Sequence, residues 1–229
     1  KRIISLLLAL SMMISLVPVS ALANTGGGIG SAVYTSNETL RDLVMNSNGT
    51  PNLDGIKPDS NGVYQGKNWT YQEKDGVEKL TLEKGTWDFS YTYPADGTGP
   101  ALTEVNCIVQ INDGATVKGG TFKDTVKNGV NDRENNIRVK GGTIEGGKFD
   151  CNVYNYGGTI KNGEFTHCWN DNLDDAKGTI EGGTFDSNGM SASVTNYGII
   201  SGGTFNDLVT SDWKGVIEKG TFNGIVSND

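Results

Sequence analysis

Residues Ile180-Glu181-Gly182-Gly183-Thr184-Phe185 return twenty positions later, almost unchanged, as Ile200-Ser201-Gly202-Gly203-Thr204-Phe205. The shared unit is an apolar residue, two variable residues, a glycine, one variable residue and an aromatic residue. Seven copies occur, at residues 82–87, 117–122, 144–149, 160–165, 180–185, 200–205 and 217–222. From Phe122 to Phe222 the aromatic positions are 27, 16, 20, 20 and 17 residues apart, so the unit is constant while its connections vary in length.

A unit of this length cannot bury its own apolar positions and needs neighbours to do so. Stacking successive units at the strand spacing of about 4.8 Å pairs each strand with the one before and the one after it. The isoleucine and phenylalanine positions then form internal ladders, and the residue before the aromatic points outward by strand alternation. We therefore predict an all-β chain, a parallel β-solenoid or right-handed β-helix, with coils of about 16–20 residues.

Two other folds fit parts of this pattern. A helical repeat is disfavoured because each coil holds two glycines, and each would cost about 1 kcal/mol inside a helix. An antiparallel sandwich stays open, although near-identical units favour stacking. A second apolar position lies four residues after most of the aromatics, and we expect its members to join the core: Val126, Val153, Trp169, Val209 and Val226.

The first 23 residues predict a cleaved signal peptide. Lys1 and Arg2 precede an apolar run, and Ala21-Leu22-Ala23 matches a small-x-small cleavage site. A membrane anchor is the weaker alternative because the run is short and ends at Pro18. We expect residues 24–35 to be a glycine-rich linker, 36–79 an N-terminal cap region, and 80–229 the solenoid repeats.

Both ends of the predicted solenoid need protection, because open strand edges pair with other chains. Residues 36–45 predict a short amphipathic capping helix with Ser36 or Asn37 as its N-cap, and Leu40, Leu43 and Val44 on its apolar face. We expect the C-terminal end to be truncated, or covered by another chain, because no polar cap follows the last repeat.

Charge narrows the classes of partner. The chain carries 19 Lys and Arg against 27 Asp and Glu, and removal of Lys1 and Arg2 leaves 17 against 27, a change in net charge from −8 to −10. An acidic exported protein is poorly suited to nucleic acid or anionic lipid. No later stretch is long and apolar enough to span a membrane. We expect a secreted or cell-surface protein, and the sequence leaves its oligomeric state open.

The order of segments resembles a known group of proteins. A signal-like start precedes Trp69-Thr70-Tyr71, the stretch Leu80-Thr81-Leu82-Glu83-Lys84-Gly85-Thr86 and serial Gly-Gly-Thr-Phe units. This combination resembles the repetitive exported surface proteins of Gram-positive gut anaerobes, whose repeats are similar to pectin-lyase-like β-helices. The resemblance covers residues 80–229, and residues 31–79 more loosely. It implies an adhesin-like or glycan-binding stalk, although related β-helices include polysaccharide lyases and hydrolases.

Asp171, Asp174 and Asp175 form the densest acidic segment, near Glu164 and His167 in the sequence. Paired carboxylates perform general acid and base catalysis on glycans. The same aspartates offer oxygen ligands for calcium, although the glycine and distal glutamate of an EF-hand loop are absent. The simpler interpretation is a solvated corner loop, which leaves the protein with no catalytic group, metal or other cofactor.

Aromatic residues and cysteines supply the other candidates. Tyr156, Tyr197 and Trp213 occupy related corners, where exposed rings could stack on sugars or, alternatively, pack against the next coil. Cys151 and Cys168 follow their phenylalanines on successive coils, close enough after stacking for a disulfide. Two buried free thiols are the alternative. The chain has a single histidine, which argues against a zinc site.

These features favour an exported structural or adhesive protein that displays a surface to a glycan or protein ligand. One alternative is a lyase or hydrolase that acts on acidic polysaccharide. The other is a glycan-binding module without catalysis.

Overall fold

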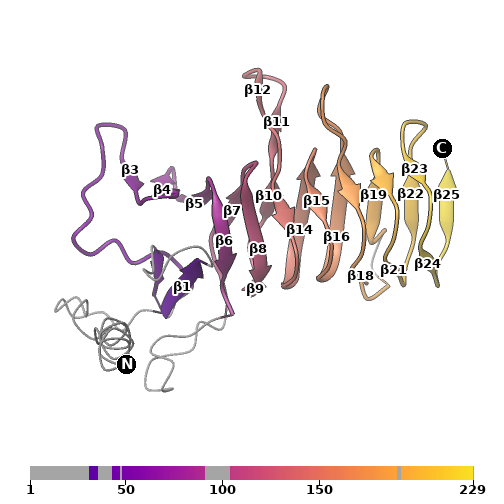
Figure 1. Cartoon of the computed structure of the whole chain (residues 1–229), viewed down its shortest axis with the longest axis horizontal. Coiled ribbons are helices and arrows are strands. Elements are labelled where there is room, and N and C mark those ends of the chain that lie inside the picture. Colours follow the sequence, from indigo (N-terminus) through magenta and orange to yellow (C-terminus); the bar gives the residue numbers. More distant parts are fainter. Residues whose placement is uncertain (1–30, 36–42, 47, 91–103, 190–191, 229) are drawn as a thin grey trace, which may run out of the picture.

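The protein is elongated, and its strands follow one another along the long axis from the N-terminal to the C-terminal end (Figure 1). The computed structural model describes residues 31–35, 43–46, 48–90, 104–189 and 192–228. In these ranges the chain is all-β, and no helix occurs there. The described part of the chain therefore also has no helix that is long and apolar enough to cross a membrane. The expected signal peptide lies outside the described residues.

Two sheets run along the molecule. The nine-stranded first sheet has the order β2 (Leu43–Met45), β1 (Ser31–Thr35), β6 (Gly85–Asp88), β8 (Ala115–Gly119), β13 (Thr143–Ile144), β15 (Thr159–Ile160), β17 (Thr179–Ile180), β20 (Ile199–Ile200) and β23 (Val216–Ile217). The fourteen-stranded second sheet has the main order β24 (Thr221–Phe222), β21 (Thr204–Phe205), β18 (Thr184–Phe185), β16 (Glu164–Asp171), β14 (Lys148–Tyr156), β10 (Val126–Asn128), β7 (Ile108–Ile111), β5 (Val77–Leu82), β4 (Trp69–Lys74) and β3 (Val63–Gln65).

Four further strands complete the second sheet. β9 (Thr121–Phe122) pairs with β14, whereas β19 (Val194–Asn196), β22 (Val209–Ser211) and β25 (Val226–Asn228) continue in that order from β16. A separate hairpin of β11 (Val130–Asp132) and β12 (Ile137–Val139) projects from the body (Figure 1).

Strands of successive repeats pair in parallel and in register. In the first sheet Ile144 pairs with Ile160, and Ile160 pairs with Ile180. In the second sheet Phe165 pairs with Phe185, and Phe185 with Phe205. Equivalent residues of successive units therefore stack directly on one another, an arrangement that is compatible with a β-solenoid.

The phenylalanines form a continuous ladder of stacked rings. From Phe122 to Phe222, neighbouring ring centroids lie 4.7 to 4.9 Å apart and their planes differ by 3 to 12°. The rings from Phe122 to Phe205 are at most 2% exposed. Burial of each ring stabilises the fold by roughly 1.5–3 kcal/mol, so the ladder supplies much of the core energy.

The glycine before each Thr-Phe pair is required by the backbone. At Gly183 the φ angle is +103°, a conformation that side-chain-bearing residues rarely adopt. A Cβ there would lie 3.1 Å from the carbonyl oxygen of Gly163, the equivalent glycine of the preceding unit. The glycine therefore lets the chain turn from one sheet to the other while successive units stay in close contact.

Buried asparagines form a second ladder that was not predicted. Asn128, Asn155, Asn170 and Asn196 are fully buried. Along this ladder each Nδ2 donates to the Oδ1 of the next residue, at 2.7, 2.8 and 2.8 Å. An amide both donates and accepts, so each later amide of the column satisfies the one before it, whereas the buried Oδ1 of Asn128, the first member, has no hydrogen-bond partner among the described residues. The sequence signal is an asparagine two residues after the core residue of β10, β14, β16 and β19, with Ser211 at the equivalent position of β22.

The repeat that contains Phe165 departs from the predicted pattern. The pairing of β14 with β16 shifts after Phe149, and Val153 then pairs with Cys168. Cys168 consequently fills the core position, whereas Trp169 faces outward and is 38% exposed. The prediction that Trp169 joins the core is wrong, because the next core position lies three residues after the phenylalanine in β16 and four residues after it in β14, so β16 has one residue fewer there.

The predicted capping helix is not confirmed in the residues that the structure describes. Residues Leu43–Met45, the last three of the expected helix, form β2 and pair with β1; residues 36–42 lie outside the described residues. Leu43 and Met45 are buried on either side of the exposed Val44, which is the alternation of a strand.

The other N-terminal strands extend both sheets. β1 occupies the last five residues of the expected linker and also pairs with β6. β3, β4 and β5 form an antiparallel meander, and β5 pairs in parallel with β7. The stretches Trp69-Thr70-Tyr71 and Leu80-Thr81-Leu82 lie within β4 and β5.

Replacing Phe185 with alanine should lower the free energy of unfolding by about 3–5 kcal/mol, because its ring is packed between Phe165 and Phe205. Urea denaturation followed by circular dichroism measures this loss. The matched control is Thr184→Ala on the same strand, which is exposed and should change stability by less than about 0.5 kcal/mol. A loss below about 1 kcal/mol for Phe185→Ala would contradict a packed ladder.

Replacing Asn170 with alanine should cost about 2–4 kcal/mol, because it leaves the amides of Asn155 and Asn196 without one partner each. Asn162→Ala, in an exposed turn, is the control. Equal effects of the two substitutions in the same denaturation assay would show that the asparagine ladder contributes nothing to stability.

Candidate functional site

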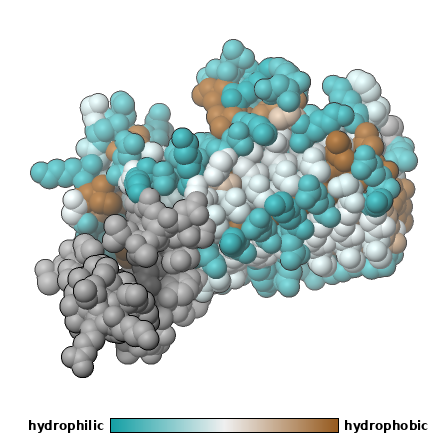
Figure 2. Space-filling view, viewed as in Figure 1, coloured by the Kyte–Doolittle hydropathy of each residue, from teal (hydrophilic) through white to brown (hydrophobic). Residues whose placement is uncertain are grey.

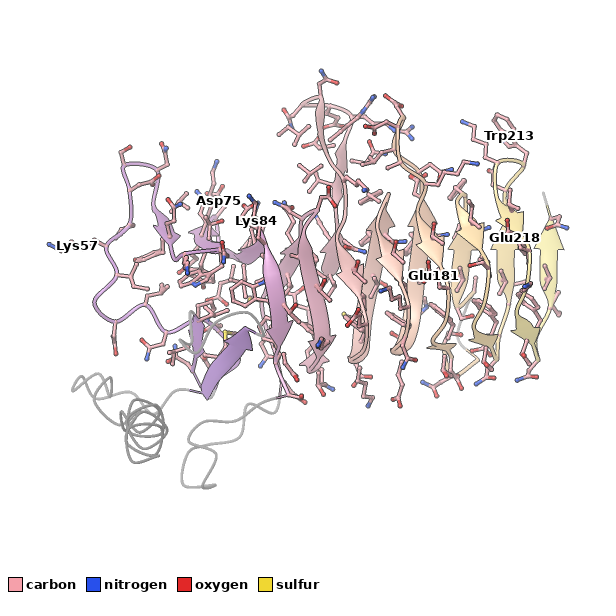
Figure 3. All side chains as sticks on the ribbon, in the orientation of Figure 1. Lys57, Asp75, Lys84, Glu181, Trp213 and Glu218 are labelled. Atoms are coloured by element: carbon pink, nitrogen blue, oxygen red, sulfur yellow. The ribbon has the colours of Figure 1, made fainter. Side chains whose placement is uncertain are left out.

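The two sheets expose different surfaces. The face seen in Figure 2 carries mainly hydrophilic and near-neutral colours, with hydrophobic colour at the upper edge and the C-terminal end. Figure 3 labels Glu181 and Glu218 on this face, which follow β17 and β23 of the first sheet. Aromatic side chains gather instead on the outer surface of the second sheet.

The aromatic side chains are placed by the register of β14 and β16. Tyr154 pairs with Trp169, and this line of outward positions continues to Lys127 on one side and to Thr195 on the other. Tyr156 lies two residues after Tyr154 and therefore faces the same way. We call Tyr154, Tyr156 and Trp169 the aromatic column.

The rings of the aromatic column are nearly parallel. The centroids of Tyr154 and Trp169 are 5.3 Å apart, those of Tyr154 and Tyr156 are 6.1 Å apart, and both interplanar angles are 11°. One face of the Trp169 indole thus meets Tyr154. The other face is directed toward Thr195, whose side chain is too short to cover an indole. The column therefore offers an apolar ring face bordered by polar groups.

A groove of about 400 Å³ lies on the same surface, and we call it the corner groove. Four successive units line it through residues 123–125, 150–152, 166–167 and 187–188. Asn152 and His167 precede Tyr154 and Trp169 by two residues on their strands, so the groove and the column share one face. Amide, hydroxyl and imidazole groups predominate in its lining.

Charged groups at the corner groove pair with one another. Lys123 Nζ lies 2.9 Å from Asp150 Oδ2 and 3.4 Å from Glu104 Oε1, and Lys148 Nζ lies 3.1 Å from the same Asp150 oxygen. The hydrogen bonds from Lys123 and Lys148 hold the pKa of Asp150 below its ordinary value, although partial burial opposes them. Asp150 therefore stays ionised at neutral pH.

The three aspartates predicted as a catalytic or calcium site are not brought together. Asp171 accepts a 2.7 Å hydrogen bond from the backbone N–H of Asn172, Asp174 forms an ion pair with Arg138 of the hairpin, and Asp175 is exposed. Across the part of the chain that the structure describes, no group of three or more His, Cys, Asp or Glu residues could hold a metal ion. The solvated-corner interpretation fits this segment best.

The three predicted glycan-contact residues lie in different surroundings. Tyr156 is half-buried in the aromatic column, and burial followed by the charge of Asp171 raises the pKa of its phenol. Tyr197 is half-buried beyond β19. Trp213 is 78% exposed and points away from the sheets at the turn between β22 and β23 (Figure 3). The sequence reasoning missed Tyr154, which the alternation from Tyr156 could have identified.

All three cysteines are free thiols, so the candidate disulfide between Cys151 and Cys168 is not formed. The bulge places Cys168 beside Val153 and leaves Cys151 in the irregular segment. Burial raises the pKa of both Cys107 and Cys151 to about 12, and it also raises the pKa of Cys168. The thiols therefore remain protonated at neutral pH and are poor nucleophiles.

Ellman's reagent at pH 8 should leave the folded protein almost unmodified, because each raised thiol pKa keeps the reactive thiolate scarce. The same reagent should titrate three thiols after unfolding in denaturant without reductant. Detection of a single thiol in the unfolded protein would reveal a disulfide, and rapid reaction of the folded protein would contradict the burial of Cys151.

The comparisons with known proteins give no relative from which to transfer a function. No protein-family model, curated protein or solved structure matches this chain. The candidate site therefore depends on its own geometry: an aromatic column beside a polar groove on one face of a parallel sheet.

Proposed function

We propose that this protein is an exported or cell-surface right-handed β-solenoid that binds an extracellular glycan without transforming it. The signal-like residues 1–23 support export. In-register parallel pairing from β7 to β25 supports the solenoid. A rigid rod of this kind is suited to an adhesive role, because it holds a binding face at a fixed place along its length.

The observation that carries the proposal is the stacked aromatic column beside the corner groove. Ligand sites combine an apolar surface with a few convergent polar groups. Trp169 and Tyr154 supply the apolar surface, and Asn152 and His167 supply polar groups on the same face. Sugar rings match this combination, because their C–H faces pack on aromatic rings while their hydroxyls bond to amides and imidazole.

The charges of the groove favour binding over catalysis. A general acid that cleaves glycosidic bonds needs a carboxyl group with a raised pKa, whereas Lys123 and Lys148 lower the pKa of Asp150. Burial raises the pKa of the Cys151 thiol to about 12, so this thiol is a poor nucleophile at neutral pH. The rival function is that of a lyase or hydrolase. Release of unsaturated product from pectin would establish a lyase, and shortening of the chains without unsaturated product would establish a hydrolase.

Trp169→Ala should weaken binding to any glycan retained on a glycan array by about tenfold or more, because it removes the exposed ring face. Trp213→Ala is the matched control: it removes an even more exposed tryptophan outside the column and should change the dissociation constant less than about twofold. Isothermal titration calorimetry measures both constants. Equal losses in the two variants, or the absence of any retained glycan, would contradict the proposed function.

A further inference from the structure

We infer that the ligand is an uncharged linear glycan that lies parallel to the long axis of the molecule, with one sugar on Trp169 and its neighbours in the corner groove. This inference rests on the proposed function and adds the charge, shape and direction of the ligand. Three observations carry it: the order of the residues that line the groove, the chemistry of those residues, and the open face of Trp169.

The groove follows the stacking direction. Its lining comes from equivalent corners of four successive units, the first at residues 123–125 and the last at 187–188. Neighbouring parallel strands are about 4.8 Å apart, so four of them extend over roughly 14 Å. A compact ligand would contact one or two of these units. An extended oligosaccharide of several sugars would contact all four.

The side chains that line the groove can form hydrogen bonds with the hydroxyl groups of a sugar. Thr125, Asn152, Thr166 and Asn188 carry hydroxyl or amide groups, and these groups both donate and accept hydrogen bonds. Thr166 Oγ1 already donates toward the carbonyl oxygens of Phe149 and Cys151, at 3.2 Å each, so it faces a ligand as an acceptor. Sugar hydroxyls can serve as donors or acceptors and can therefore adapt to every one of these groups.

Ionic contacts at the groove disfavour a charged ligand. Lys123 and Lys148 are already held by carboxylates: Asp150 pairs with both lysines, and Glu104 pairs with Lys123. Asp124 adds a further carboxylate to the lining. A polyuronate would bring one carboxylate per sugar to this surface, in a protein with a net charge of −8, and would be repelled. A polycation would have to displace Lys123 and Lys148 from Asp150.

The open face of Trp169 fixes one end of the site. Thr195 and Thr210 follow Trp169 in the same outward line, in register on β19 and β22. Their short side chains leave a shelf beside the indole, where its free face is open for a sugar ring to pack against. His167, on the same strand, connects this shelf to the groove.

The test compares ligands of different charge and length by calorimetry. The neutral probes are β-1,4-linked oligomers of glucose, mannose and N-acetylglucosamine, the acidic probe is oligogalacturonate, and the basic probe is chitosan oligomer. At least one neutral tetramer should bind about tenfold or more tightly than its own dimer and than both charged tetramers. Raising the salt concentration should leave this affinity within about twofold, because no ionic contact contributes.

A pair of variants locates the extra sugars. Asn152→Ala combined with Asn188→Ala should weaken the tetramer about fivefold or more and leave the dimer within about twofold, because a tetramer places several sugars in the groove and a dimer at most one. Asn162→Ala, in an exposed turn outside the lining, should change neither affinity and serves as the matched control.

The outcomes separate this inference from the proposed function. Binding that depends on Trp169 but favours oligogalacturonate or chitosan, or that is equal for dimer and tetramer, would overturn the inference and leave the proposed function standing. If the double variant Asn152→Ala and Asn188→Ala binds the tetramer as tightly as the unchanged protein does, the inference is likewise overturned. If none of the probes and no glycan on the array binds, both are wrong.

Discussion

The phenylalanine rings stack at 4.7 to 4.9 Å, the same distance that separates hydrogen-bonded parallel strands, about 4.8 Å. One spacing therefore satisfies the backbone hydrogen bonds and the van der Waals contact of the core at once. Any residue that breaks the register loses both contributions together. For this reason the apolar and glycine positions of the unit are repeated closely, whereas the connections between units vary from copy to copy.

The same constraint builds the candidate site. Register carries each outward position to the equivalent position of the next repeat, so Tyr154 and Trp169 must lie side by side. The exception that matters is the irregular pairing of β14 with β16. Because β16 has one residue fewer after its phenylalanine, Cys168 takes the core position and Trp169 faces solvent. The stacked core thus acts as a rigid support, and the chemistry of the surface depends on the residues placed at its outward positions.

Much of the fold could be predicted from the repeated unit, because its isoleucine, glycine and phenylalanine each have one physical role. The parallel pairing of Ile160 with Ile180 and of Phe165 with Phe185 follows from those roles. The outward position of Trp169 could not be predicted, since a bulge depends on the neighbouring strand. The helix expected over residues 36–45 failed at Leu43–Met45, where the strand buries Leu43 and Met45 and exposes Val44, which the helix would have placed on its apolar face. The asparagine ladder was missed because an isolated asparagine resembles a turn residue.

The most direct test of the account is a double-mutant cycle on the ladder, with unfolding free energies measured for Phe165→Leu, Phe185→Leu, Phe205→Leu and their pairs. Phe165 and Phe185 are in contact, with ring centroids 4.8 Å apart, whereas Phe165 and Phe205 are separated by the intervening ring. Stacking predicts a coupling energy of about 0.5–1.5 kcal/mol for the first pair and less than about 0.5 kcal/mol for the second. Equal coupling in the two pairs, or none in either, would contradict a core built from rings stacked one repeat upon the next.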